Sequence, residues 1–464
     1  MTTVSGGVTA GSAHPPDFPG ATGLFGHLKP FFKDTIGLVG RAPHDYPERA
    51  TLRFAWQRVW LINNADDARY ILQTNARNYR RPDNFQSILR DVTANSLFAS
   101  QGDPWLRQRR ALQPAFHRQR IAGFGTIMTE EAQASTSRLL AAARSGATVL
   151  VQNEMTRVAL NIVGRALFGV DMEASARGPA LANAFEGIAE YMNYRFRTPF
   201  APPLWVPSAT NRAFVRQRQT MRTIVADVLE ERRRSGESYN DFLQMLMELR
   251  YDDTGEGMSD EQIVNESASF FFAGHETTAN TLTWAWYLLA QNPDAETALH
   301  EELDQVLAGR TATVDDLPRL QYTQHVIEEA LRLYPPAWVI SRQAIAEDEI
   351  GGMHVKPGTG MMINTFGIQR HPAYWHDPDE FLPERFAAET PQHPRHAWIP
   401  FGEGPRLCIG NQFAMVETQL VLATLAQQIR LRTPAGYTPE PWPLFALRVR
   451  DSLPMQVGRR LVPT

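Results

Sequence analysis

One long stretch of this chain limits its fold more than any other. Ser259-Asp-Glu-Gln262 has the capping-box pattern, in which a serine and a glutamine three residues later satisfy free backbone N–H groups at a helix start. The segment that follows, IVNESASFFFAGHETTANTLTWAWYLLAQ, predicts one long helix that ends before Asn292-Pro293. Because apolar residues lie on nearly all of its sides, this helix must be covered by other elements.

Helical patterns dominate the region between about residues 105 and 335. The segment AETALHEELDQVLAG predicts a helix that ends at Gly309. A further segment, QYTQHVIEEALRLY, predicts a helix that stops at Pro335-Pro336, since proline cannot continue a helix. The buried helix is therefore expected to lie among other helices.

Strand patterns are few. Residues 50–62 read as strand, and residues 353–366 read as two extended arms about a Lys356-Pro-Gly turn. We therefore expect a mostly α fold with a minor β-sheet region. Residues 1–18 are rich in small residues and proline and predict a flexible leader, followed by one domain over residues 19–464.

The composition is that of an ordinary globular protein, with 43% apolar and 21% charged residues. A net charge of −4 gives no reason to expect a nucleic-acid partner. The N-terminal residues lack the basic flank and apolar core of a signal peptide, and they contain no membrane anchor. One cysteine cannot form an internal disulfide, so nothing requires an oxidising compartment. We expect a soluble, cytoplasmic protein.

The centre of the long helix is chemically unusual, because Gly274, Glu276, Thr277 and Thr278 interrupt an apolar sequence. A small residue beside hydroxyl groups can open the hydrogen-bond ladder of a helix. One interpretation is a tolerated kink, with the Thr277 hydroxyl bonded back to the previous turn. The other is a groove where a ligand crosses the helix, with Glu276 and Thr277 moving protons. The helix pattern alone leaves both open.

The only cysteine stands in FGEGPRLCIG, among three glycines and a proline. A lone cysteine is most often a small, buried apolar side chain. This loop, however, resembles that of the haem-thiolate monooxygenases, the cytochrome P-450 superfamily, in the spacing of Phe401, Gly404, Arg406, Cys408 and Gly410. The resemblance runs from about Pro19 to the C-terminus and implies the single-domain fold of that family.

The resemblance implies haem b as cofactor, with Cys408 as the thiolate ligand of the iron. A thiolate ligand favours cleavage of the O–O bond of dioxygen, but a buried thiolate is costly. Glycines fit this role because they let backbone N–H groups approach the sulfur, and the helix that follows Cys408 adds its positive end. Phe401 would pack against the sulfur side of the porphyrin.

Two further motifs carry the resemblance. Ala273-Gly-His-Glu-Thr-Thr278 matches the oxygen-activation motif, in which Glu276 and Thr277 would relay protons and Ala273 would leave room for the ligand. His275 could look like an iron ligand, but in this motif it points elsewhere. Glu329-Ala-Leu-Arg332 matches the Glu-x-x-Arg motif, and Arg385 in FLPERF would complete a buried structural cluster. A surface ion pair is the alternative for such spacing.

Arginines and a tryptophan are the implied partners of the haem propionates. Trp105 and Arg109 lie one helical turn apart, so both can face one carboxylate. Arg342 and Arg406 are the other implied partners. Arg107 and Arg110 are expected on a basic surface on the cysteine side. The full implied cofactor-binding set is Trp105, Arg109, Ala273, Arg342, Phe401, Arg406, Cys408 and Gly410.

The expected substrate pocket follows only from position within the family. It comprises Phe85, Ile88, Leu89, Ala273, Thr277, Ala337, Trp338, Val339 and Leu453. Its members indicate an apolar pocket narrowed by bulky side chains. Residues of the predicted lid that could supply a carboxylate clamp are Tyr191, Tyr194, Arg195 and Arg197.

The implied activity is insertion of one oxygen atom from O2 into a largely apolar small molecule: a fatty acid, a terpenoid or steroid, or a polyketide. NAD(P)H would act only indirectly, through a separate reductase with a ferredoxin or flavodoxin, since one cysteine cannot hold an iron–sulfur cluster. The chain is expected to be a monomer. The alternatives are a peroxide-driven peroxygenase and a haem sensor, and a sensor would not need Glu276 and Thr277.

Overall fold

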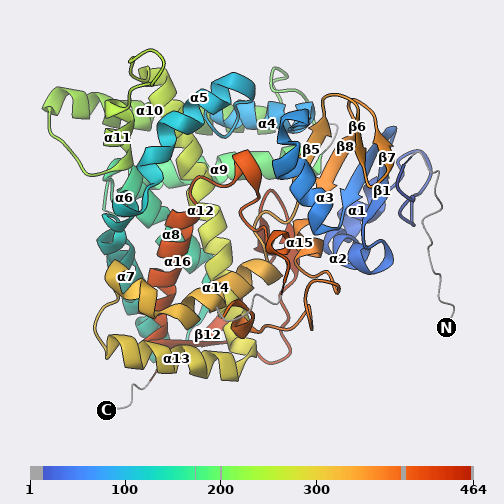
Figure 1. Ribbon diagram of the computed structural model, residues 1–464. Coiled ribbons are helices and arrows are strands. Elements are labelled where there is room, and N and C mark those ends of the chain that lie inside the picture. Colours follow the sequence, from blue (N-terminus) through green and yellow to red (C-terminus); the bar gives the residue numbers. More distant parts are fainter. Residues whose placement is uncertain (1–13, 173, 199–200, 388–392, 461–464) are drawn as a thin grey trace. The chain divides into compact units, whose positions relative to one another are not determined.

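The computed structural model describes residues 14–172, 174–198, 201–387 and 393–460 (Figure 1). The chain divides into two compact units. The first contains Met1–Pro82, Trp338–Asp379 and Gln392–Leu407, and the second contains Asp83–Ala337, Glu380–Pro391 and Cys408–Thr464. Most of the predicted leader, residues 1–13, lies outside the described residues.

The first unit is built on a mixed five-stranded sheet in the order β1-β2-β8-β5-β3. Residues 50–62, predicted as strand, form a hairpin in which a two-residue turn at Ala55-Trp56 joins β1 to β2. The two predicted arms of 353–366 join different sheets, because β7 pairs with β6 while β8 pairs with β2 and β5. The strands are β1 (Arg49–Phe54), β2 (Gln57–Ile62), β3 (Tyr79–Arg80), β5 (Ile340–Ala344), β6 (Asp348–Ile350), β7 (Met353–Val355) and β8 (Gly360–Ile363).

Short helices complete the first unit. They are α1 (Leu28–Lys33), α2 (Thr35–Asp45), α3 (Ala65–Arg69) and α15 (Thr365–Ile368), with a π-helical turn at Tyr70–Thr74 and 3-10 turns at Ala76–Asn78, Arg395–Ala397 and Gly404–Arg406.

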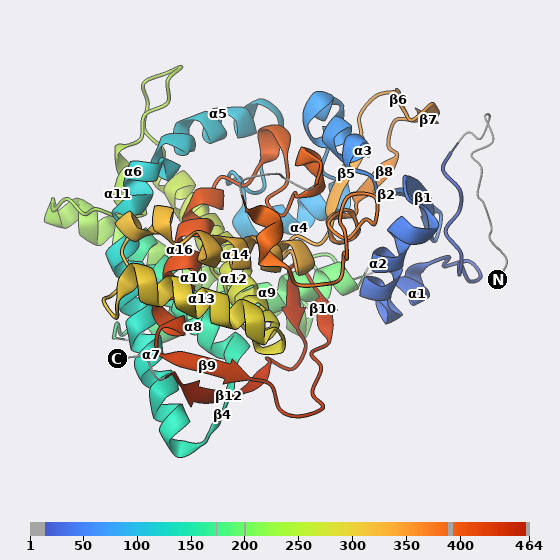
Figure 2. The same cartoon turned by 60° about the horizontal axis from the view of Figure 1, so that its bottom comes forward.

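The second unit is helical and surrounds α12 (Asp260–Gln291), the long helix expected from the sequence. The Ser259 side chain accepts a hydrogen bond from the Gln262 N–H, and the helix ends at Asn292. Figures 1 and 2 show α12 among α8, α14 and α16, and α10 also packs on it. The other helices are α4 (Asp83–Thr93), α5 (Gly102–Leu112), α6 (Arg118–Ala122), α7 (Gly125–Ser145), α8 (Val151–Phe168), α9 (Gly178–Arg197), α10 (Ala209–Ser235), α11 (Phe242–Glu248), α13 (Pro293–Leu307), α14 (Gln321–Leu333) and α16 (Asn411–Ala426). The unit also has 3-10 turns at Gln113–Phe116, Val314–Arg319 and Pro383–Phe386.

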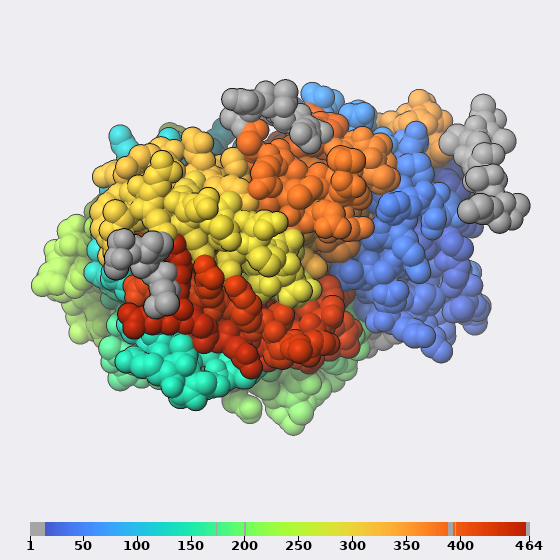
Figure 3. Space-filling model, turned by 90° about the horizontal axis from the view of Figure 1, so that it is seen from below, coloured from blue at the N-terminus to red at the C-terminus, as the bar shows by residue number. Residues whose placement is uncertain are grey.

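Two small sheets lie in the second unit. β4 (Thr148–Leu150), β12 (Pro454–Arg459) and β9 (Ile429–Arg432) pair in that order, and β10 (Pro441–Pro443) pairs with β11 (Leu447–Val449). In Figure 3, α13 (yellow) and the strand region of the last residues (red) lie side by side on one face. The expected mostly α fold with minor β-sheet is confirmed. Within the described ranges, no helix is long and apolar enough to cross a membrane.

Candidate active site

Cys408 lies just before α16 in the second unit. Many protein atoms surround its thiol, and the residue still keeps solvent-accessible surface. Burial raises the pKa of its thiol, while the Gly410 N–H and the Arg109 guanidinium act in the opposite direction. The chain nevertheless leaves the Cys408 surface exposed in the part that the structure describes. A cysteine that is surrounded by protein and still keeps accessible surface can bind a ligand there. The fully packed cysteine of the apolar interpretation could not.

The residues before Cys408 belong to the first unit. Gly404 has φ +68°, and a Cβ there would lie 2.1 Å from the Leu72 carbonyl oxygen, so only glycine fits. The half-buried Phe401 ring meets Trp398 edge-on, with 6.2 Å between ring centroids. Arg406 ends a 3-10 turn that begins at Gly404.

The centre of α12 has an uncovered face. Its neighbours are buried, but Ala273 is exposed and Gly274 and Thr277 are half-buried. The Thr277 hydroxyl donates to the Ala273 carbonyl oxygen at 2.9 Å, as the kink interpretation expects, although α12 stays α-helical over its whole length. An uncovered strip on a buried helix is also what the groove interpretation requires. The two interpretations are therefore compatible.

Glu276 is buried beside this strip, and its carboxyl group is incompletely bonded. Its Oε1 lies 4.0 Å from the Arg448 Nη1 of β11 and has no hydrogen bond among the described residues. Burial raises the Glu276 pKa, and Arg448 opposes this shift. The carboxyl can therefore hold a proton at higher pH than an exposed glutamate.

His275 packs into the core. Its Nδ1 lies 2.9 Å from the Phe271 carbonyl oxygen, and its ring lies against Phe185 and Phe271. Burial lowers the His275 pKa, which favours the neutral ring. That His275 does not ligate the iron stays a prediction.

One turn of α12 is connected to α16 through a second buried carboxyl group. The Thr278 hydroxyl donates to Oε2 of Glu417 at 3.1 Å, while Oε1 of Glu417 has no hydrogen bond among the described residues. Burial raises the Glu417 pKa to about 8, and the Thr278 hydroxyl only partly opposes this. The sequence places Glu417 in a family-like segment but gives no sign of this buried pair.

Two arginines lie close together in the first unit. In the register of β3 and β5, Tyr79 is opposite Ala344 and Arg80 is opposite Gln343. Arg81 and Arg342 are the next residues of the two segments, and Arg81 acts electrostatically on Arg342. Burial lowers the Arg342 pKa to about 9, with a further contribution from Arg81, and burial lowers the Arg81 pKa to about 10. Desolvated neighbouring cations favour a bound anion. Arg81 is absent from the sequence-based set.

On α5, Arg109 is half-buried and electrostatically coupled to Cys408. Trp105 is partly buried against the core of the second unit. Arg107 instead donates to Asp253 at 3.1 Å and lies over the Tyr251 ring, so it is held on the protein surface.

Four phenylalanine rings from four segments meet in the second unit. Phe445, in the turn between β10 and β11, lies 6.2 Å from Phe85, 6.1 Å from Phe98 and 5.6 Å from Phe272, measured between ring centroids. Sequence reasoning included only Phe85. The other three stand in segments with no signal that would bring them together.

The remaining expected pocket residues have different surroundings. Leu89 and Leu453 are fully buried, and Trp338 packs against Phe31 in the core of the first unit. Ile88 and Val339 are half-buried, and Ala337 is exposed. Leu89, Leu453 and Trp338 thus have packing roles here, and their contact with a substrate stays a prediction.

Glu329 receives both arginines that the sequence pattern grouped with it. Its carboxylate lies 2.6 Å from Nε of Arg332 and 3.2 Å from Nε of Arg385, and all three side chains are buried. The Leu382 N–H also donates to Glu329. The cluster joins α14 to the turn at Pro383–Phe386.

A family model described as Cytochrome P450 matches residues 16–456. The chain belongs to the cytochrome P450 family. It is 32% identical over 437 residues to the cyclooctat-9-en-7-ol 5-monooxygenase of Streptomyces melanosporofaciens, covering 92% of this chain and 94% of that protein. It is 33% identical over 422 residues to the pentalenene oxygenase of Streptomyces avermitilis, covering 89% and 90%. The crystal structure of the cytochrome P450DA heme domain matches with a TM-score of 0.89 and 26% identity, over 96% and 97%.

This chain is therefore a P450 monooxygenase, an oxidoreductase, as the motifs predicted. The family implies a haem-thiolate cofactor and O2, and the residues present fit them. In the second unit, Cys408 and Ala273 are exposed and Thr277 is half-buried. In the first unit, Arg342 and Arg81 are desolvated cations suited to carboxylates such as haem propionates.

Proposed function

We propose that this P450 hydroxylates a terpenoid, using one atom of O2 and electrons from a separate reductase through a ferredoxin or flavodoxin. Haem b, bound through Cys408, would supply the oxygen-activating chemistry. Trp105, Arg109, Arg342 and Arg406 would hold its propionates, with Phe401 and Gly410 around the ligand. Arg81 joins this set because it lies beside Arg342 in the strand register.

The observation that carries the substrate class is the pairing of polar residues in the lid. The Arg195 guanidinium donates to the Tyr191 hydroxyl at 2.8 Å and to Asp91 at 3.1 Å. Tyr191 is buried and stacked on Phe214, with 3.8 Å between ring centroids. Groups that satisfy one another are poorly placed to bind a fatty-acid carboxylate. A hydrocarbon skeleton with few polar groups does not need such a clamp.

Two further features support a terpenoid. The rings that meet around Phe445 offer apolar contacts to a bulky carbon skeleton. The relatives named cyclooctat-9-en-7-ol 5-monooxygenase and pentalenene oxygenase act, by their names, on such compounds.

Proton supply is assigned to Glu276 and Thr277. The Thr277 hydroxyl rests on the Ala273 carbonyl at 2.9 Å and can rotate to donate to a molecule on the uncovered strip. Glu276, whose pKa burial raises, can replace that proton through water. This pair also favours O2 over the peroxide-driven alternative, because hydrogen peroxide already carries the two protons that O2 has to acquire before its O–O bond breaks.

The test is turnover of a panel of cyclic terpenes and fatty acids by the haem-loaded protein with a surrogate ferredoxin, its reductase and NADPH. We expect a substrate-induced spin-state shift and a hydroxylated terpene that carries label from 18O2. Hydroxylation of fatty acids with no terpene product would contradict the substrate class. Faster turnover with hydrogen peroxide than with the redox partners would favour the peroxygenase.

A further inference from the structure

An exposed apolar patch with basic surroundings lies in the first unit, apart from the residues assigned to the reaction. Its centre is formed by Leu24, Phe25 and Trp56, whose side chains are 87%, 59% and 79% exposed. Single exposed apolar residues are common on protein surfaces, but a group of three large ones is a mark of an interaction site.

Backbone hydrogen bonds hold these side chains in place. The Ala55 N–H donates to the Phe25 carbonyl oxygen at 3.2 Å, which joins the loop before α1 to the β1–β2 turn that carries Trp56. Thr22 and Gly26 bond to each other through both N–H groups, so Leu24 and Phe25 stand at the tip of a closed loop. Gly26 is required there, because a Cβ would lie 2.2 Å from the Arg53 carbonyl oxygen. These hydrogen bonds therefore hold the loop at Leu24-Phe25 and the turn at Trp56 with their apolar side chains in solvent.

The charged residues inside these segments are basic, and Asp17, Asp34 and Glu48 flank them. Residues 19–33 and 49–62 contain no aspartate or glutamate, in a chain with net charge −4. The edge contact of Phe31 with Phe54, at 5.2 Å between ring centroids, holds α1 against the end of β1. The basic residues of these segments, which include two of the three lysines of the chain, are Lys29, Lys33, Arg49, Arg53 and Arg58. Of these, Arg49 is buried and paired with Asp67, and the exposed Arg58 lies 4.0 Å from Asp17. Lys29 and Lys33 are exposed.

We propose that this patch docks the protein on the surface of an anionic phospholipid bilayer. Leu24, Phe25 and Trp56 would enter the boundary between headgroups and acyl chains, where tryptophan is favoured. Lys29 and Lys33 would place their long side chains toward the phosphates. A second copy of the chain fits less well, since a symmetric contact would bring the same lysines together. The proposal is independent of the substrate assigned above.

The test is co-sedimentation of the full-length, haem-loaded protein with phosphatidylcholine vesicles, with and without phosphatidylglycerol. We expect binding only to the anionic vesicles, weakened by salt. The variant L24S/F25S/W56S should weaken binding by at least about tenfold, and K29Q/K33Q by about fivefold for each lysine. Brominated lipids should quench more fluorescence in the wild type than in W56F.

The matched controls are L150S for the apolar change and R233Q/R234Q for the charge change, both at exposed sites of the second unit. These should bind vesicles like the wild type. The account is overturned if the wild type does not bind anionic vesicles, or if the triple variant binds them equally well. It is also overturned if the patch variants alter only self-association or the rate of reduction by an acidic ferredoxin.

Discussion

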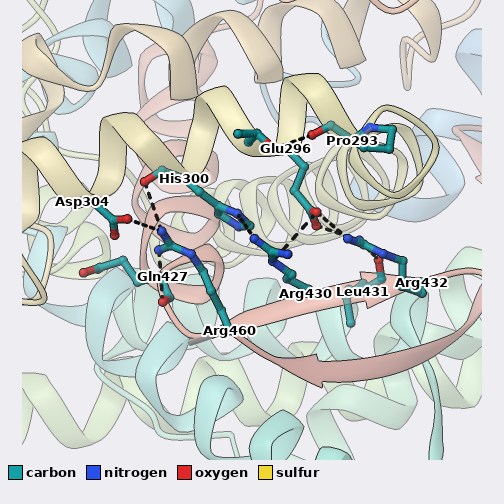
Figure 4. Close-up of polar contacts among 10 residues, drawn as sticks. Pro293, Glu296, His300, Asp304, Gln427, Arg430, Leu431, Arg432 and Arg460 are labelled. Atoms are coloured by element: carbon teal, nitrogen blue, oxygen red, sulfur yellow. Dashed lines mark hydrogen bonds and ion pairs between the residues drawn. The ribbon is translucent and has the colours of Figure 1, made fainter. Parts of the chain in front are cut away.

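Two regions of the second unit bury carboxyl groups in opposite ways. Between α13 and the β9–β12 strands, Glu296 receives two hydrogen bonds from Arg432, at 2.8 and 2.5 Å (Figure 4). Arg460 donates to Asp304 in the same network. Around the centre of α12, by contrast, Glu276 has Arg448 only at 4.0 Å. Glu417 of α16 accepts one hydrogen bond among the described residues, from the Thr278 hydroxyl.

Carboxylates paired with arginines hold secondary-structure elements together, whereas buried carboxyls without such partners can bind and release protons. A carboxylate that is matched by arginines fixes the position of its helix, and the Glu329 cluster does the same for α14. A carboxyl that is buried without such a partner binds a proton more tightly, and the Glu276 and Glu417 pKa values are both raised by burial. The Glu417 pKa of about 8 lets that carboxyl exchange a proton near neutral pH, and burial moves the Glu276 pKa in the same direction.

The histidine of the first region follows the same rule. His300 accepts a hydrogen bond from Arg430 at 3.3 Å, which requires the ring nitrogen Nδ1 to be unprotonated. Burial and the neighbouring Arg460 lower the His300 pKa to about 4. The His300 ring is therefore neutral near neutral pH.

The largest effect is expected where the pairing is most complete. Glu329→Gln would leave Arg332 and Arg385 without their buried carboxylate, at a cost of about 3–5 kcal/mol in the free energy of unfolding. Urea denaturation followed by circular dichroism measures this change. Glu301→Gln, an exposed position on α13, is the control and should change little. A loss of unfolding free energy no larger than that of the control would show that this cluster does not stabilise the fold.

The next effect concerns the proton-handling region and should appear in activity instead of stability. Thr277→Ala should keep reduction by the redox partner but lower the product formed per NADPH by about tenfold or more, with oxygen released as peroxide. The control is Thr283→Ala, which removes a hydroxyl bonded to the Ala279 carbonyl on the same helix. Unchanged coupling in Thr277→Ala would remove Thr277 from the proton path.

The third prediction compares how the two kinds of carboxyl change the pH dependence of stability. The Glu417 pKa is raised from 4.5 to about 8, so the folded protein holds a proton that the unfolded chain releases. Its contribution to stability is complete below pH 4.5 and is lost as pH rises through 8, with a slope of up to about 1.4 kcal/mol per pH unit. Glu417→Gln should flatten the decline of stability between pH 5 and 8.

Glu296→Gln is the matched change in the paired region. It should lower stability without flattening that decline, because it removes the ion pair with Arg432 and leaves the buried Glu417 carboxyl in place. Thermal unfolding of the haem-retaining proteins across this pH range distinguishes the two variants. Equal slopes in Glu417→Gln and the wild type would show that Glu417 does not hold the proton.

The smallest effect should come from Arg448→Gln. Arg448 lowers the Glu276 pKa, so its removal should raise that pKa and move the alkaline limb of the coupling profile to higher pH by less than about one unit. The measurement is product per NADPH against pH. Arg450→Gln, which breaks an exposed pair with Glu440, should leave the profile in place. A shift to lower pH would contradict the assigned contact.

The sequence predicted those helices and strands whose bounds depend on residues close together in the chain. The cap at Ser259 and the stop at Asn292-Pro293 fix α12, because both act within a few residues. The 50–62 hairpin was missed because its turn, Ala55-Trp56, lacks the usual glycine or asparagine. The site motifs were found through spacing along the chain.

Contacts between distant segments could not be read from the sequence. Arg81 meets Arg342 only through the pairing of β3 with β5, and Glu417 meets Thr278 only through the packing of α16 on α12. Phe445 contacts rings from three other segments for the same reason. These residues carry no local pattern, and their importance comes from tertiary packing.

One spectrum can show whether Cys408 is the thiolate ligand of a haem. The purified protein is reduced with dithionite, and the difference spectrum with carbon monoxide is recorded for the wild type and for Cys408→Ala. We expect a strongly red-shifted Soret band in the wild type and its loss in the variant. A wild-type band at the ordinary position, not corrected by pH or fresh preparation, would contradict the claim.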